Sequence, residues 1–208
     1  MCFQQRASFV SHQSWNKKMK KLIALFLLCL AAQAFAVEVA GVKLDGKVQV
    51  GNATLQLNGA GIRTRIFFDV YVAALYLGEK KTSAASVLAD AGEKRMALHM
   101  LRDVGAKTLL DAFNAAIAAN HTPDELAALD ASIKEFSAIF NAMAEVKKGD
   151  VIALDYQPPS KPSGGTQVSV NGVSKGKIAG AAFNTALLKI WLGEKPAQAD
   201  LKRKLLGL

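Results

Sequence analysis

The stretch Asn58–Leu77, which reads NGAGIRTRIFFDVYVAALYL, decides the fold of this chain. In an extended strand successive side chains alternate between two faces. Most even positions of the stretch are apolar, and its odd positions include the polar side chains Arg63, Arg65, Asp69 and Tyr71. We therefore expect a glycine-rich turn that leads into one long strand with an apolar face and a polar face.

Arg63 is the most informative of these polar side chains. A guanidinium on a strand this hydrophobic is costly to bury unless it meets an anion, and its planar fork fits a carboxylate with two hydrogen bonds. The anion is either an acidic side chain of the protein or the acid group of a ligand, and the residues alone leave both interpretations open. Asp69 is expected to pair with Arg65 or to face solvent.

Further segments accompany this stretch along the chain. They are Lys147-Lys148-Gly149-Asp150 before a strand, VNG at residues 170–172, GAAFN at 180–184 and LKIWLGEKP at 188–196. With these segments in this order, the chain resembles the chalcone isomerase-like family, and its secreted bacterial members more than the plant enzymes. The likeness covers about residues 37–208.

The resemblance implies an α+β fold, the open-faced β-sandwich of the chalcone isomerase type. In this fold a mostly antiparallel sheet is covered by a helical layer, and a ligand cleft lies between the two. The order of the expected elements agrees, because strands and helices are segregated more than alternated.

The resemblance also implies site residues. Arg63 matches the arginine that receives the phenolate of the substrate in the isomerases and a carboxylate in the fatty-acid-binding members. Tyr71 matches the tyrosine that shares this carboxylate, at the position where the plant enzymes place a catalytic threonine. Thr108 corresponds loosely to their catalytic tyrosine, and Ile190 to a further hydroxyl residue. Because these residues differ from the catalytic hydroxyl residues, the negative charge that develops during ring closure would be poorly stabilised. Isomerase activity is therefore not expected.

The distance between Arg63 and Tyr71 poses a problem for this site. The two residues share a strand face by parity, but a straight strand would hold them about 26 Å apart at 3.3 Å per residue. A bend or a bulge between them is therefore required.

The rest of the chain predicts short elements around this strand. Short strands broken at Asp45-Gly46 and Gly51-Asn52 should precede it. After it we expect, in order, a helix over 83–91, a strand through Met96, Leu98 and Met100, a helix over 105–119, a helix that opens with a capping box at Thr122-Pro123-Asp124-Glu125 and ends at Lys147-Lys148-Gly149, a strand over 151–156, a hairpin of 166–170 with 173–178 across a type I′ turn, a helix over 180–192 and a short closing helix.

Residues 1–36 are interpreted as a leader. Lys20 and Lys21 precede the apolar run 22–32, and Ala34-Phe35-Ala36 has the pattern of a signal peptidase site. The 15-residue run 22–36 is shorter than the about 20 residues of a membrane span. We therefore expect a true start at Met19, cleavage after Ala36, and a periplasmic or secreted domain over residues 37–208.

Cleavage would change the cysteine content and the net charge of the chain. Cys2 and Cys29 would be lost, and the net charge would fall from +9 to +4, because the leader holds five basic residues and no acidic ones. Such a modest charge gives no reason to expect nucleic acid or an anionic membrane as partner, and no stable membrane insertion is expected. The oligomeric state is left open.

The chain shows no motif for a metal, a nucleotide or a serine nucleophile. Gly59-Ala60-Gly61 begins like a dinucleotide fingerprint, but Thr64 stands where the third glycine belongs. No cofactor and no metal are expected. His99 and His121 are interpreted as structural or solvated side chains.

We predict a secreted, non-catalytic protein that binds a small amphipathic carboxylate or phenolic ligand, such as a fatty acid. Arg63 would anchor the head group with help from Tyr71, and Thr108 is a further candidate. One alternative is an intramolecular lyase of the chalcone isomerase type, which two or more further polar groups around Arg63 would favour. The other is a protein-interaction module, which a filled, closed cleft would favour, whereas a deep apolar tunnel would favour the lipid binder.

Overall fold

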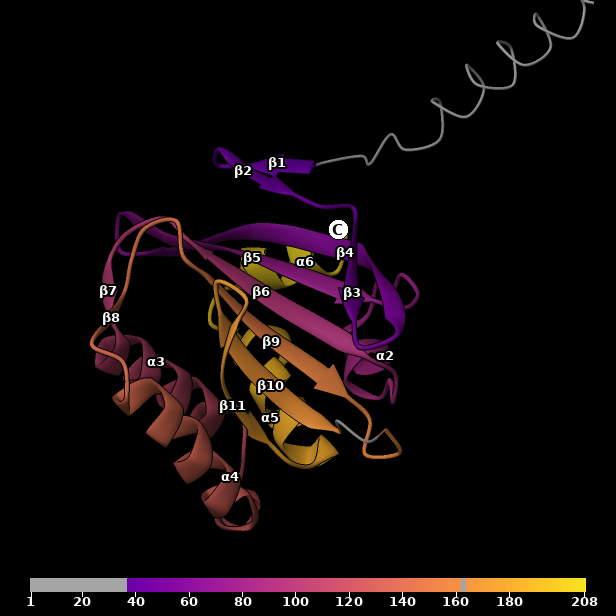
Figure 1. The fold of residues 1–208 in the computed structure, drawn as a ribbon, viewed down its shortest axis with the longest axis vertical. Coiled ribbons are helices and arrows are strands. Elements are labelled where there is room, and N and C mark those ends of the chain that lie inside the picture. Colours follow the sequence, from indigo (N-terminus) through magenta and orange to yellow (C-terminus); the bar gives the residue numbers. More distant parts are fainter. Residues whose placement is uncertain (1–36, 162–163) are drawn as a thin grey trace, which may run out of the picture. The chain divides into compact units, whose positions relative to one another are not determined.

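Seven strands form one antiparallel sheet in the order β11-β10-β9-β6-β5-β4-β3 (Figure 1). The computed structural model describes residues 37–161 and 164–208, so the leader and its cleavage site lie outside the described residues. The strands of the sheet are β3 (Lys47–Val50), β4 (Ala53–Arg65), β5 (Phe68–Leu77), β6 (Lys94–Met100), β9 (Val151–Gln157), β10 (Gly165–Val170) and β11 (Val173–Ile178). Two small antiparallel pairs complete the strands: β1 (Val37–Val39) with β2 (Val42–Leu44), and β7 (Val104–Gly105) with β8 (Glu145–Val146).

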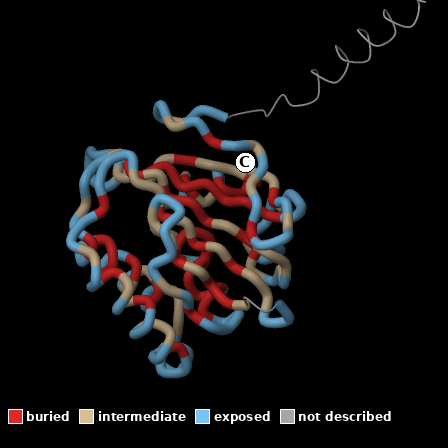
Figure 2. Tube along the Cα trace, in the orientation of Figure 1, coloured by how far each residue is buried: buried red, intermediate tan, exposed pale blue. Residues whose placement is uncertain are grey.

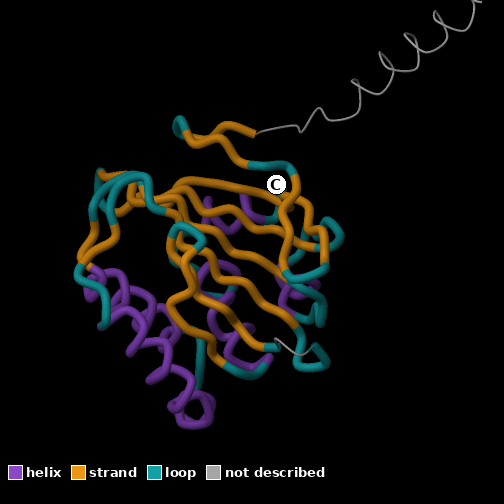
Figure 3. The backbone as a smooth tube through the Cα atoms, in the orientation of Figure 1, coloured by secondary structure: helices purple, strands orange, loops and turns teal. Residues whose placement is uncertain are grey.

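Helices pack on one face of the sheet. Figure 3 colours the helices purple and the strands orange. They are α2 (Ala84–Leu88), α3 (Ala106–Ala119), α4 (Pro123–Asn141), α5 (Ala181–Leu192) and α6 (Ala199–Leu205). This arrangement confirms the expected α+β class with an antiparallel sheet under a helical layer. Within residues 37–161 and 164–208, no helix is both long and apolar enough to cross a membrane.

Both faces of strand β5 are buried, because alternate residues from Tyr71 to Leu77 belong to two different core clusters. Figure 2 draws the buried residues of the sheet in red. Tyr71 and its alternate neighbours belong to the main core beneath the helices, together with Phe113, Phe136 and Trp191. Val72, Ala74 and Tyr76 point to the other face, where β1, β2 and β3 supply the packing partners. A strand buried on both faces positions its side chains rigidly, and Tyr71 is one of them.

The stretch Asn58–Leu77 forms two strands instead of the single strand expected. β4 ends at Arg65, a turn at Ile66 and Phe67 reverses the chain, and β5 begins at Phe68. Ile66 has a φ of 59°, a left-handed conformation that is rare for a β-branched residue. The sequence concealed this turn because none of its residues is a usual turn former.

The expected glycine-rich turn at residues 58–61 is also wrong, because these residues lie within β4. A Cβ atom on Gly59 would lie 2.1 Å from the carbonyl oxygen of Lys204, and one on Gly61 would lie 3.0 Å from the side chain of Leu201. The two glycines therefore let helix α6 pack closely against the strand.

The capping box at the start of α4 is confirmed. Thr122 Oγ1 accepts from the Glu125 amide at 3.3 Å, and the Glu125 carboxylate accepts from the Thr122 amide at 2.8 Å. The helix ends at Asn141 and not at residues 147–149, because Glu145 and Val146 pair with β7 instead. The β10–β11 turn has φ values of 51° at Asn171 and 76° at Gly172, as a type I′ turn requires.

Candidate functional site

The β4–β5 hairpin places Arg63 directly opposite Tyr71. The two residues are register partners, with a shift of register between Arg63 and Thr64. Opposite residues of an antiparallel pair have Cα atoms about 4.5 to 5.5 Å apart and side chains on the same face. The bend that the sequence required between them is therefore the turn at Ile66 and Phe67.

The Arg63 guanidinium is half-buried and meets only neutral groups. Its Nη1 atom donates to the Thr64 carbonyl oxygen at 2.6 Å and to Gln198 Oε1 at 3.3 Å. No carboxylate of the described residues forms an ion pair with it. Arg95 differs, because Asp155 accepts from both arms of its guanidinium. The cationic charge of Arg63 is thus left without an anion.

Gln198 is a site residue that the sequence did not reveal. Its Oε1 atom accepts from the Thr64 amide at 2.9 Å as well as from Arg63. It immediately precedes α6, and more than 130 residues separate it from Arg63. A lone glutamine in a polar segment carries no pattern that could have identified it.

Tyr71 brings a neutral hydroxyl group to Arg63. The side chain is buried, and its oxygen accepts from Trp191 Nε1 at 3.0 Å. Burial raises the pKa of Tyr71 to about 12, although Trp191 and Arg63 both act to lower it. Trp191 and Arg63 are hydrogen-bond donors only, so the hydroxyl proton of Tyr71 remains available to an acceptor in the cavity.

A cavity of about 560 Å³ brings Arg63, Tyr71 and Thr108 together. Its size is within the usual range for sites of small molecules, about 300 to 1,000 Å³. It lies between the end of the β4–β5 hairpin, the helix α3 and the end of α5, and most of its lining is apolar, including Val70, Val104, Leu109, Phe113, Ile190 and Ala197. A ligand with an acid group and an apolar body would match the half-buried Arg63 cation on this mostly apolar wall.

Exposed polar residues form the rim of this cavity. Thr108 and Asp111 project from α3, and Asp111 pairs with Lys107 at 2.8 Å. Arg65 also lines the cavity but is exposed at the end of β4. Asp69 accepts from Thr64 Oγ1 at 2.8 Å and is exposed. Of the two expectations for Asp69, exposure to solvent is therefore found, and an ion pair with Arg65 is not.

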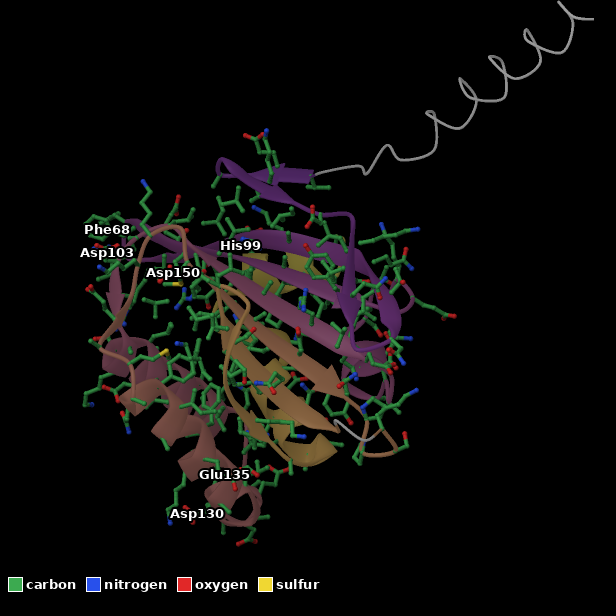
Figure 4. The ribbon with its side chains drawn as sticks, in the orientation of Figure 1. Phe68, His99, Asp103, Asp130, Glu135 and Asp150 are labelled. Carbon is green, nitrogen blue, oxygen red and sulfur yellow. The ribbon has the colours of Figure 1, made fainter. Side chains whose placement is uncertain are left out.

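A second cavity of about 350 Å³ adjoins the first. The two share the lining residues Arg65, Val70, Val104 and Thr108. The second cavity also reaches Phe68 and Asp103, which Figure 4 labels next to each other at one end of the molecule. The larger cavity therefore continues toward the tip of the β4–β5 hairpin.

The two histidines of the described residues, His99 and His121, line neither cavity. His99 on β6 is half-buried and pairs with Val72 and Val151 in the sheet, and burial lowers its pKa. His121 Nδ1 lies 2.7 Å from the Ile117 carbonyl oxygen at the end of α3. In the part of the chain that the structure describes, no group of three metal-ligating side chains is found.

The sequence and the fold of this chain are similar to those of known proteins. A family model described as "Chalcone isomerase-like" matches residues 36–207. No curated protein matches the chain significantly. Among solved structures, a fatty-acid binding protein of Arabidopsis thaliana superposes with a TM-score of 0.61 at 15% sequence identity, over 82% of this chain and 95% of that chain. At this identity the likeness is one of fold alone.

Proposed function

Since the chain belongs to the chalcone isomerase-like family, we propose that it binds a small amphipathic acid, such as a fatty acid, in the larger cavity. One observation carries the proposal: the half-buried Arg63 guanidinium faces an apolar cavity and has only neutral partners. A ligand carboxylate supplies the missing anion. The similar fold of a fatty-acid binding protein supports the same class of ligand.

In this proposal the head group binds between Arg63 and Tyr71. Arg63 supplies a charge-assisted hydrogen bond, and Tyr71 donates the proton that its pKa of about 12 retains at neutral pH. The acyl chain lies against the apolar walls, where each buried methylene contributes about 0.8 kcal/mol. Thr108 lies at the rim and can contact the ligand without holding its charge.

Two features favour binding over the alternatives. Beyond Tyr71, Gln198 is the one described side chain that bonds to Arg63, whereas catalysis of ring closure would need several donors around the developing charge. The cavity is also neither filled nor closed, because exposed residues of α3 line it. An interaction module with a vestigial cleft would not keep such a space.

Truncation of Arg63 tests the proposal. Arg63→Ala should weaken binding of a long-chain fatty acid by roughly 2 to 5 kcal/mol, or about thirtyfold to several thousandfold. Arg63→Lys should recover part of the affinity, because an ammonium keeps the charge and loses the two-pronged geometry. Titration calorimetry measures the affinities, and thermal melts check that both variants fold.

Arg65→Ala is the control. Arg65 carries the same charge at the exposed rim, where a charge pair is worth about 1 kcal/mol or less, so this variant should lose no more than about fivefold in affinity. Equal fatty-acid affinity of the wild type and well-folded Arg63→Ala would contradict the proposal.

We also propose that the protein is exported and acts in the periplasm or outside the cell. The basis is the sequence pattern of residues 19–36. N-terminal sequencing of the exported protein should find Val37 as its first residue. A mature protein that keeps Met19 would contradict export by cleavage.

A further inference from the structure

The tip of the β4–β5 hairpin exposes three consecutive large apolar side chains. Ile66, Phe67 and Phe68 are 78%, 90% and 58% exposed, respectively. The other large apolar side chains exposed in the described residues, Val37, Val173 and Leu208, are isolated from one another in the sequence. Single exposed apolar residues are ordinary, but a contiguous group marks an interaction site.

The backbone of the tip is strained as well as exposed. Ile66 adopts a φ of 59°, which costs about 1 to 3 kcal/mol for a residue other than glycine. Ile66, Phe67 and Phe68 belong to neither core cluster of the described residues, so their packing in the core does not offset the strain at Ile66.

The tip lies at the mouth of the site. Ile66 and Phe68 line the smaller cavity, which shares four lining residues with the cavity of Arg63. Whatever covers the tip therefore faces the opening through which a ligand would reach Arg63.

Two unpaired arginines flank the tip. Arg102 places its guanidinium carbon 4.7 Å from the centre of the Phe68 ring. Neither Arg65 nor Arg102 forms an ion pair with a carboxylate of the described residues. The nearby acids have other partners, since Asp69 accepts from Thr64 and Asp103 accepts from the Lys148 amide.

We infer that Ile66, Phe67 and Phe68 insert into the surface of a lipid bilayer, with Arg65 and Arg102 at the level of anionic headgroups. Large apolar side chains such as those of Phe bury themselves at the boundary of headgroups and acyl chains, and long basic side chains reach the phosphates. The inference rests on the proposed function, because the inserted tip would hold the cavity mouth against the lipid that supplies the acid. The contact is peripheral and reversible, since three side chains anchor far less than a spanning helix.

A protein partner fits the tip less well. The exposed parts of three such side chains offer on the order of 400 Å², whereas a stable interface buries about 800 Å² on each partner. A bilayer has no such requirement, because each inserted side chain gains its transfer free energy separately.

Co-sedimentation with vesicles tests the inference. Vesicles of equal parts phosphatidylglycerol and phosphatidylcholine should bind the wild-type protein, and Phe67→Ser should lower the partition coefficient about tenfold or more. Val173→Ser is the matched control, since Val173 is 60% exposed in the β10–β11 hairpin, and it should change nothing. Arg102→Gln should lower binding to these vesicles about fivefold, and less to pure phosphatidylcholine.

The same variants separate this inference from the proposed function. Phe67 lines neither cavity, so Phe67→Ser should keep the fatty-acid affinity in solution and slow the uptake of fatty acid from vesicles. Arg63→Ala should do the reverse, with vesicle binding kept and affinity lost. Equal partition of the wild type and Phe67→Ser, or self-association through the tip without vesicle binding, would overturn the inference. A wild type that binds vesicles through Phe67 but takes up no fatty acid would overturn the proposed function.

Discussion

Arg63 and Tyr71 lie directly opposite each other in adjacent strands, although they are eight positions apart in the chain. A straight strand would hold their Cα atoms about 26 Å apart, and the hairpin brings them to about 5 Å. This pairing brings together two polar side chains of one hydrophobic stretch, and in the proposed function they share the head group of the ligand.

Tyr71→Phe should affect both binding and stability. Loss of a hydrogen bond to a charged ligand costs about 1.5 to 3 kcal/mol, or about ten- to a hundredfold in fatty-acid affinity. The variant also leaves Trp191 Nε1 buried without its acceptor, which should cost about 1 to 3 kcal/mol of unfolding free energy. Tyr76→Phe is the control, because Tyr76 lies in the core cluster on the other face of the sheet, and it should leave affinity unchanged. If Tyr71→Phe folds well and keeps the wild-type affinity, the Tyr71 hydroxyl does not bond to the ligand.

The protein should lose stability steeply in alkaline solution. Burial raises the pKa of Tyr71 from 10.0 to about 12, so above about pH 10 the unfolded chain releases this proton while the folded chain retains it. The unfolded state then binds fewer protons, and Tyr71 alone lowers the unfolding free energy by up to about 1.4 kcal/mol per pH unit until about pH 12. Tyr76, whose pKa burial also raises to about 12, adds a similar slope. Urea unfolding across this range measures the slope, which should be shallower in Tyr71→Phe. Identical slopes would show that Tyr71 ionises equally in both states.

Gly59→Ala should destabilise the protein by about 1 to 3 kcal/mol or more. The new Cβ atom would lie 2.1 Å from the Lys204 carbonyl oxygen, and a backbone atom can move only if helix α6 shifts. Gly78→Ala is the matched control, since nothing lies within 4 Å of a Cβ atom there, and its melting temperature should stay the same or rise slightly. Equal melting temperatures of the two variants would mean that α6 docks loosely.

Ile66→Asn should stabilise the protein while it weakens the contact with lipid. Asparagine tolerates the left-handed conformation better than a β-branched residue, so relief of strain should add about 1 kcal/mol and raise the melting temperature by about 2 to 4 °C. Ala40→Asn at φ 49° in the β1–β2 turn should stabilise similarly and leave vesicle binding unchanged. A lower melting temperature for Ile66→Asn would contradict the idea that the backbone of Ile66 is strained.

The purified protein should close chalcones no faster than buffer does. Ile190 presents an apolar side chain to the cavity, and the resemblance to the family matches it to a hydroxyl residue of the isomerases. Absorbance of the chalcone follows the reaction, with heat-denatured protein as the blank. A rate well above background that disappears in Arg63→Ala would instead support an intramolecular lyase.

Much of the fold could be predicted from local patterns. The capping box of α4, the Asn171-Gly172 turn and the breaks at Gly46 and Gly51 depend on residues close in sequence, whose backbone preferences act in any context. The end of α4 could not be predicted this way. Glu145 and Val146 leave the helical pattern to pair with β7, a contact that no local preference encodes.

The types and order of the residues were enough to predict the family and the α+β class, and the cost of burying a cation singled out Arg63 as a candidate binding residue. Only the tertiary structure decided where that charge lies. The turn at Ile66 lacks the usual turn residues, so its existence depends on the pairing of residues 56–65 of β4 with β5. Gln198 joins the site because α6 packs against Gly59 and Gly61. Contacts between residues far apart in the chain form only when the whole core is buried, and that is a property of the packed molecule.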